Sequence, residues 1–134
     1  MELKGDGYVV ASLGEDSGYV PYTAFSAKKS YIEENPDTIQ AFTNALQKGM
    51  EYVASHTPEE IAKVIKPQFE ETDLETLTTI VTRYYEQDTW KSDLIFEEEA
   101  FTLLQNILEE SGELPKRVPY EDLVTTTFAE KAAK

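Results

Sequence analysis

The stretch NPDTIQAFTNALQKGMEYVASHTPEE, residues 35–60, predicts two consecutive helices. Asn35 is a favourable N-cap, and Pro36 fits the first helical position, where no N–H is needed. A capping box opens the second helix, because Glu60 follows Thr57 by three residues. Apolar side chains of the first helix recur on one face at helical spacing: Ile39, Phe42, Leu46, Met50 and Val53. The second helix carries Ile61, Val64 and Ile65 and is expected to stop before Pro67.

The sequence downstream predicts two further helices and a less regular end. Thr72-Asp73-Leu74-Glu75 repeats the capping-box spacing. A fourth helix is expected from about Phe96 to Ser111, with Gly112 as its C-terminal cap. Residues 119–124 allow a short helix, and the Ala/Lys-rich end is expected to fray. The expected inward side chains are Leu74, Leu77, Val81 and Tyr84 in the third helix, and Leu104, Ile107 and Leu108 in the fourth.

Residues 8–27 favour extended structure. A β-rich run, Tyr8 to Leu13, is followed by the polar turn Glu15-Asp16-Ser17-Gly18 and by a second run over residues 20–27. Pro21 is compatible with a strand end or an edge strand. We therefore predict an α/β class, with two strands followed by about four to five helices. Since two strands alone are marginally stable, either the helices cover them or they belong to a larger sheet.

Composition excludes several classes of function. The net charge of −14 repels phosphate backbones and anionic membranes, and the 12 Lys and Arg residues form no basic patch. The absence of cysteine rules out disulfides, thiolate nucleophiles and Cys-based zinc sites. His56 is the single histidine and is expected to have a structural role at a helix end. We predict no nucleic-acid partner, no metal site and no cofactor.

Motifs of catalysis and targeting are also missing from the sequence. Gly5-Asp6-Gly7 precedes an expected strand, which is the wrong order for a dinucleotide-binding loop. No serine has the glycines of a nucleophile elbow around it. We therefore predict no catalytic residues and a protein that is not an enzyme. The N-terminal MELKGDGYVV has no signal-peptide pattern, and no run is long and apolar enough to span a bilayer.

Aromatic residues gather near the polar turn. Tyr19 and Tyr22 lie beside Asp16, Ser17 and Gly18. Tyrosine rings next to hydroxyl, carboxylate and backbone N–H groups are typical of a small-molecule cleft. The chemistry of the turn itself equally explains an Asp-Ser-Gly sequence. The residue types alone leave both interpretations open.

The run GYVVASLGEDSGYVPYTAFSAKKSYIEENPDTIQAFTNALQKGMEYV, residues 7–53, resembles a known family. It is similar to the carboxy-terminal part of the nitrate/sulfonate/taurine/thiamine-pyrimidine group of substrate-binding proteins of ABC importers. The pattern is a strand, a polar loop, a second strand that ends in a short helix, and Asn-Pro at the start of a long helix. The later segments HTPEEIAKVI, RYYEQDTW and LLQNILEESGEL follow the same family.

This resemblance implies a clamshell of two α/β lobes, of the periplasmic-binding-protein type II kind, with a ligand held between them. Residues 1–134 are then a single carboxy-terminal fragment, residues 7–27 are hinge strands at the cleft, and residues 28–134 are the helical part of one lobe. The expected ligand contacts are Asp16, Ser17, Gly18, Tyr19, Tyr22 and, as a weaker choice, Trp90.

The resemblance also implies the partners of the intact protein. A heteroaromatic or sulfonate-like small molecule is the expected ligand, and the importer's membrane subunits are the expected protein partners. The intact protein is expected outside the cytoplasmic membrane, either lipid-anchored or periplasmic. The acidic composition favours a neutral or cationic heteroaromatic over an anion, although local charge outweighs net charge in a cleft.

Two further predictions concern assembly and the alternative function. Edge strands without neighbours recruit another chain, so we expect a homodimer with paired or swapped strands. The alternative function is a helical protein-interaction module without a small-molecule ligand. A binding lobe exposes Tyr19 and Tyr22 beside the turn, whereas a helical module buries them. An enzyme is the third hypothesis, through a family resemblance to pyrimidine-synthesis enzymes, but the chain lacks the cysteines and histidines of such chemistry.

Overall fold

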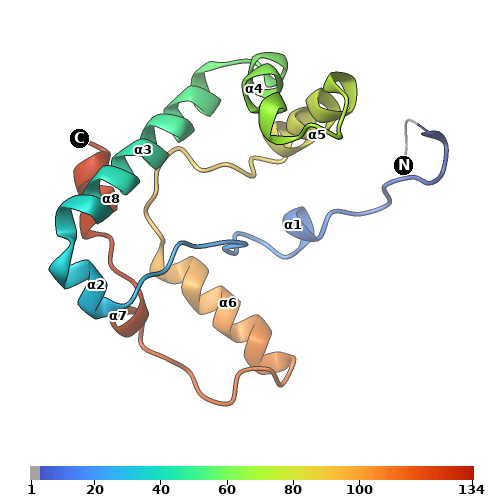
Figure 1. Cartoon of the computed structure of the whole chain (residues 1–134). Coiled ribbons are helices and arrows are strands. Elements are labelled where there is room, and N and C mark those ends of the chain that lie inside the picture. Colours follow the sequence, from blue (N-terminus) through green and yellow to red (C-terminus); the bar gives the residue numbers. More distant parts are fainter. Residues whose placement is uncertain (1–3) are drawn as a thin grey trace. The chain divides into compact units, whose positions relative to one another are not determined.

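The computed structural model describes residues 4–134, and its regular structure is helical (Figure 1). Residues 4–134 contain no β-strand. The elements, in chain order, are α1 Leu13–Asp16, α2 Lys29–Glu34, α3 Pro36–Ser55, α4 Pro58–Ile65, the 3₁₀ turn η2 Lys66–Gln68, α5 Leu74–Glu86, α6 Glu98–Glu110, α7 Tyr120–Leu123 and α8 Thr127–Ala132.

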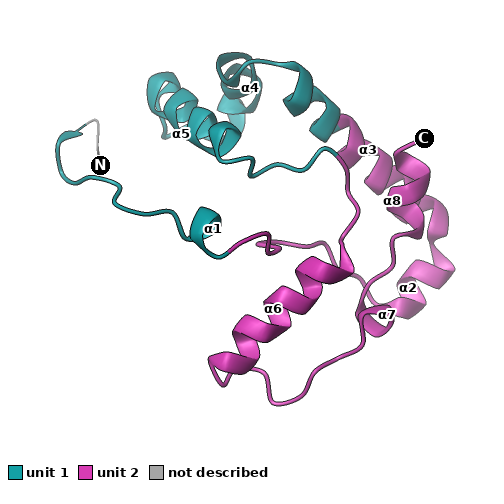
Figure 2. Cartoon of the chain, turned by 180° about the vertical axis from the view of Figure 1, so that it is seen from behind, with its two compact units in different colours: residues 1–17, 49–92 teal, residues 18–48, 93–134 magenta. Residues whose placement is uncertain are grey.

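The chain divides into two compact units (Figure 2). Unit 1 comprises residues 1–17 and 49–92, and unit 2 comprises residues 18–48 and 93–134. The boundary between Lys48 and Gly49 falls inside α3, so this helix contributes residues to both units. Each unit has its own buried side chains and its own hydrogen bonds.

The core of unit 1 lies between α4 and α5. Its buried side chains are Ile61, Ala62, Leu77 and Val81. Tyr52 and Val53 from α3, Ile65 from α4 and Trp90 pack around them. The prediction that Leu77 and Val81 point inward is therefore confirmed, because both side chains are buried on one face of α5. Leu74 and Tyr84, which were expected on the same stripe, are exposed.

The predicted capping box at the start of α4 is confirmed. Thr57 Oγ1 accepts a hydrogen bond from the Glu60 N–H at 3.3 Å, and Glu60 Oε2 accepts one from the Thr57 N–H at 2.9 Å. The hydrogen bonds from Thr57 lower the pKa of the Glu60 carboxyl from its ordinary value. Two otherwise unsatisfied N–H groups of the helix start are thus paired.

The start of α5 differs from its prediction by one residue. Asp73, not Thr72, is the N-cap, and its Oδ1 accepts from the Thr76 N–H at 2.8 Å. Asp73 Oδ2 also accepts from the Thr76 hydroxyl at 2.8 Å. One carboxylate therefore accepts from both the main-chain N–H and the hydroxyl of Thr76, and these bonds lower the pKa of Asp73.

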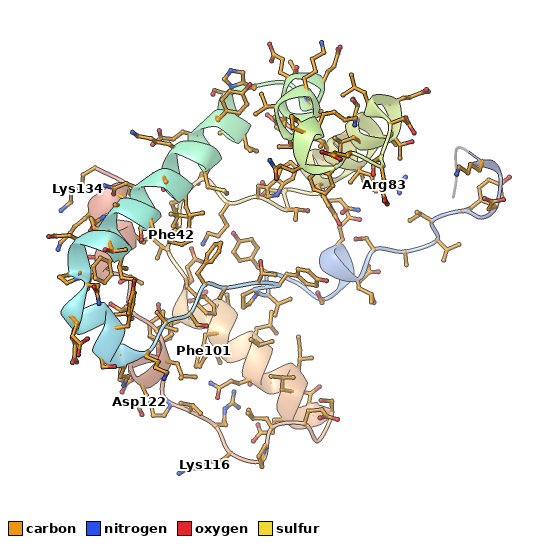
Figure 3. The ribbon with its side chains drawn as sticks, in the orientation of Figure 1. Phe42, Arg83, Phe101, Lys116, Asp122 and Lys134 are labelled. Atoms are coloured by element: carbon orange, nitrogen blue, oxygen red, sulfur yellow. The ribbon has the colours of Figure 1, made fainter. Side chains whose placement is uncertain are left out.

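The buried side chains of unit 2 are centred on α6. Phe101 (labelled in Figure 3) is buried, and its ring lies edge-on to Phe96 at 6.0 Å and to Tyr120 at 5.7 Å. The Tyr120 hydroxyl donates to the Phe96 carbonyl oxygen. Of the side chains expected inward, Leu104 and Leu108 are half-buried and Ile107 is exposed.

The end of α6 agrees with its prediction, whereas the C-terminal segment of the chain does not. Gly112 ends α6 as expected, at the left-handed position directly after the C-cap Ser111: its φ is +78° and its N–H donates to the Glu109 carbonyl. The C-terminal segment, which was expected to fray, forms α8 instead. Ala129 of α8 is buried, and Gln40 Nε2 donates to the Phe128 carbonyl oxygen at 3.0 Å. These contacts tie α8 to α3.

The two predicted strands are the main error in the expected fold class. Within residues 8–13, Leu13 begins the short helix α1, and residues 20–27 run without helix or strand. A strand exists only where a neighbour pairs with its backbone, and residues 4–134 provide no such neighbour. The β-forming residue types are present, but the paired strand that they require is absent from the described residues.

Candidate functional site

The polar turn begins at the end of α1, in unit 1. Asp16 is the last residue of this helix, and Ser17 is its C-cap, whose N–H donates to the Leu13 carbonyl at 3.0 Å. The Ser12 carbonyl accepts from the N–H groups of both Glu15 and Asp16. No residue of α1 is buried. The carboxylate of Asp16 and the hydroxyl of Ser17 therefore stand on an exposed turn.

The other three predicted loop residues belong to unit 2. Gly18 has a φ of +80°, which favours glycine, and a Cβ there would lie 3.5 Å from Leu103 Cδ2. Tyr19 is 54% exposed and Tyr22 is 98% exposed. The predicted residues thus form one exposed loop along the chain, but the boundary between the units passes between Ser17 and Gly18.

Trp90 has a different environment from the loop residues. Its ring packs against the core of unit 1 and lies edge-on to Tyr84, with ring centroids 6.0 Å apart. The side chain is half-buried, so only part of its ring is available to a ligand. The structure does not bring Trp90 and the loop residues of unit 2 together within one unit.

An aromatic anchor that the sequence analysis did not single out holds the loop to α3. The Phe25 ring lies edge-on to Phe42, with centroids 5.0 Å apart and planes at 80°. Figure 3 shows Phe42 on α3. The helical spacing of Phe42 predicted which face of the helix its side chain occupies. No pattern in the sequence predicted its contact with Phe25. Tyr22 lies three residues before Phe25 in the same segment.

Two hollows in the surface of the described residues lie away from the predicted site. One of about 450 Å³ is lined by residues 67–72, which follow α4, and one of about 230 Å³ is lined by α5 residues. No predicted site residue lines either hollow. The lining of the second is Thr78, Thr79, Thr82, Arg83 and Glu86.

The described part of the chain has neither a metal-binding cluster nor a membrane-spanning helix. Residues 4–134 contain no group of three or more His, Asp or Glu side chains arranged to hold a metal ion. No helix among them is both long and apolar enough to cross a bilayer. His56, the single histidine, is placed by its contacts with Tyr52, which lies four residues earlier.

Comparison with known proteins gives two matches. Residues 9–61 match the family described as "NMT1/THI5 like". A protein of Bacillus subtilis (strain 168) named "Putative binding protein YtlA" is 45% identical over 131 residues. The matched region is 98% of this chain and 39% of that protein, so the chain spans well under half the length of its relative. No solved structure matches the chain.

These matches confirm the family resemblance drawn from the sequence. The matched segment, residues 9–61, includes the polar loop and the Asn-Pro helix start on which that resemblance rests. The NMT1/THI5-like family has the periplasmic-binding-protein type II fold, so the predicted α/β class holds for the family. The described residues 4–134 of this chain themselves form helices and no strand.

Proposed function

From this similarity to an NMT1/THI5-like binding protein, we propose that the chain is part of the solute-binding component of an ABC importer. Its role is then reversible binding of a small molecule without catalysis. Residues 7–27 form the cleft-side segment, and residues 28–134 form the helical part of one lobe. The importer's membrane subunits are the protein partners, and the intact protein acts outside the cytoplasmic membrane.

The observation that carries this proposal is the exposure of Tyr19 and Tyr22 beside the polar turn. A helical interaction module would bury these rings in its own core. Tyr22 instead has nearly its whole surface open to solvent, and Tyr19 about half. Exposed tyrosines that follow Asp16, Ser17 and the N–H groups of a turn in the sequence offer stacking surfaces and hydrogen-bonding groups along one short stretch of chain.

The chemistry of the loop supports a planar polar ligand. A tyrosine ring stacks on a flat heteroaromatic ring, and its hydroxyl both donates and accepts. Asp16 accepts hydrogen bonds or pairs with a cation, whereas Ser17 and the Gly18 N–H donate to an acceptor such as a sulfonate oxygen. We therefore propose a heteroaromatic or sulfonate-like ligand, with a neutral or cationic heteroaromatic favoured by Asp16 and the net charge of −14.

A thermal melt of the 134-residue chain with a panel of heteroaromatics and sulfonates tests the proposal. A ligand at 100 times its dissociation constant adds about 2.7 kcal/mol of stability if it binds only the folded chain. We expect one class of compound to raise the melting temperature. Tyr22→Ala should abolish this rise, and Tyr8→Ala, a similarly exposed tyrosine that is not one of the proposed ligand contacts, should leave it intact.

Two outcomes would contradict the proposal. If no compound of either class changes the melting temperature, this chain does not bind such ligands. If Tyr8→Ala reduces the rise as much as Tyr22→Ala does, the binding is not located at the loop.

A further inference from the structure

The 20-residue helix α3 leaves the apolar stripe of its unit 2 part uncovered. This stripe, the α3 stripe, consists of Ile39, Phe42 and Leu46, which recur on one face at helical spacing. None of the three is buried: Ile39 and Leu46 are half-buried, and Phe42 is 46% exposed. An amphipathic helix gains most of its stability by packing such a stripe against a core, so the α3 stripe is expected to have a neighbour.

The face of α3 that is covered is a polar one. Gln47 is the one buried residue of α3, with 7% of its surface exposed. Gln40 lies seven residues earlier and therefore on the same face, and its Nε2 donates to the Phe128 carbonyl oxygen of α8. Helix α8 thus lies at the glutamine face, while the α3 stripe remains open to solvent at Phe42.

Phe25 extends the α3 stripe without covering it. Its ring lies edge-on to Phe42 (labelled in Figure 3), with ring centroids 5.0 Å apart, yet Phe25 is itself 75% exposed. Two rings that contact each other and both keep much of their surface in solvent belong to one continuous apolar patch. Exposed patches of this kind mark surfaces that another part of a protein covers.

The charges around the stripe define the chemistry of a partner. Residues 38–47 of α3 contain no charged side chain, although 28% of the residues in the chain are charged. A charged surface that docked here would lose its hydration without finding an opposite charge. An apolar surface loses nothing of this kind and gains by burial.

We propose that the α3 stripe and Phe25 bind the apolar face of a β-sheet, supplied by the part of an NMT1/THI5-like binding protein that this chain does not match. The family has an α/β fold, whereas residues 4–134 contain no strand. The match covers 39% of the relative from Bacillus subtilis, so the larger part of that protein remains to supply the sheet. In α/β domains, helices bury their apolar stripes on the faces of a sheet.

A second copy of this chain fits the stripe less well than the rest of such a protein does. Its residues 4–134 would bring the same helices and no sheet. The inference rests on membership of the family alone and does not depend on the binding of any ligand.

Thiol labelling tests whether the stripe is covered, since the natural chain has no cysteine. Phe42→Cys places a thiol on the stripe, and Lys48→Cys places one at an exposed position on another face of the same helix. Each variant is compared in the 134-residue chain and in a full-length hybrid, in which this chain replaces the matched region of the Bacillus subtilis relative. Peptide mass spectrometry identifies the labelled residue.

We expect the labelling rate of Phe42→Cys to fall about tenfold or more in the hybrid, because thiol reactivity follows exposure. The rate of Lys48→Cys should change less than about twofold. Equal rates of Phe42→Cys in the chain and the hybrid, or a hybrid without a cooperative thermal transition, overturn the proposal. A rate in the 134-residue chain that falls as its concentration rises would assign the stripe to a second copy and also overturn it.

Two asparagine variants test the energetic contribution of the stripe. We expect Leu46→Asn to lower the melting temperature of the hybrid by several degrees more than that of the 134-residue chain, because only the hybrid buries this side chain fully. Lys48→Asn should shift both proteins equally little. Equal shifts by Leu46→Asn in the two proteins overturn the proposal. A hybrid that protects Phe42→Cys but binds none of the heteroaromatics and sulfonates supports this inference and contradicts only the proposed function.

Discussion

The ring of Tyr52 lies nearly parallel to the imidazole ring of His56, with ring centroids 3.6 Å apart and planes at 14°. The Tyr52 carbonyl oxygen is also 2.8 Å from His56 Nδ1. A carbonyl oxygen accepts hydrogen bonds, so Nδ1 is the protonated nitrogen in this contact. The single histidine of the chain thereby closes the end of α3, immediately before the capping box of α4.

Replacing His56 should weaken unit 1 through both of these contacts. We expect His56→Ala to lower the free energy of unfolding by about 1–2 kcal/mol, because it removes a hydrogen bond to the last turn of α3 and a stacked ring. Urea denaturation monitored by circular dichroism measures this. Gln68→Ala, an exposed position of the same unit, is the control and should change stability by less than about 0.5 kcal/mol. Equal effects of the two variants would show that the contacts contribute nothing.

The core of unit 1 offers a matched pair of positions on α5. Leu77 is 3% exposed and lies in the core cluster, whereas Ile80 is 43% exposed. We expect Leu77→Ala to cost about 2–5 kcal/mol through lost burial and the cavity that remains. Ile80→Ala should cost much less, since its side chain is largely in water already. Chemical denaturation of both variants checks the difference, and a larger loss for Ile80→Ala would contradict the assigned inward face.

The sequence predicted those parts of the structure that depend on nearby residues. Helices α3 to α6 were expected near their observed bounds, because caps, prolines and apolar spacing all act within a few residues. The capping box of Thr57 and Glu60 and the left-handed Gly112 are of this kind. The N-cap of α5 was predicted at Thr72 and lies at Asp73, which shows the limit of such patterns. Both residue types are favourable N-caps, and the sequence alone does not decide between two adjacent ones.

Features that depend on distant residues were not predictable from the sequence. Residues 20–27 have the composition of a strand, but a strand requires a paired neighbour. Helix α8 was missed because its support comes from Gln40, which is 88 residues from Phe128 in the chain. The residue types of Asp16, Ser17 and Gly18 indicated a polar turn, because turn chemistry is local. The packing of Trp90 against the core depends on the tertiary fold and has no such local signal.

The capping box at α4 predicts a pH-dependent contribution to stability. The pKa of Glu60 is lowered in the folded chain, mainly by hydrogen bonds from Thr57. A lowered folded-state pKa means that the stabilisation is present above the ordinary value of 4.5 and is lost as the pH falls through the folded-state pKa. We therefore expect the natural chain to be more stable than Glu60→Gln at neutral pH, with the gap closing in acid.

Urea denaturation at a series of pH values measures this gap. Thr57→Ala is the control background, because it removes the hydroxyl partner of Glu60 and itself costs about 1 kcal/mol as a lost N-cap. The gap between the natural residue and Glu60→Gln should be smaller in that background, as expected for coupled neighbours. A gap that is constant from neutral to acidic pH would contradict the assignment.

Two glycines with different backbone conformations, one at positive φ and one inside a helix, give a further prediction. Gly112 has a φ of +78° at the end of α6, and Gly49 lies inside α3 with no atom within 4 Å of a Cβ placed there. We expect Gly112→Ala to destabilise the chain by about 1 kcal/mol, because a side chain is strained at positive φ. Gly49→Ala should stabilise it by about 0.5–1 kcal/mol through helix propensity. Thermal melts of both variants check the signs, and a stabilising Gly112→Ala would contradict the observed cap.

Gln105 provides the last prediction, because it joins α6 to the segment before α7. Its side chain is 8% exposed; Nε2 donates to the Val118 carbonyl at 3.2 Å, and Oε1 accepts from the Val118 N–H at 2.8 Å. Gln105→Met keeps the volume but leaves both main-chain groups of Val118 without this partner, so we expect a loss of about 2–4 kcal/mol. Thr102→Ala, on an exposed position of the same helix, should stay within about 0.5 kcal/mol. Hydrogen exchange localises the effect: the Val118 amide should lose protection in Gln105→Met and keep it in Thr102→Ala. If its protection is unchanged in Gln105→Met, the paired hydrogen bonds do not hold this segment to α6.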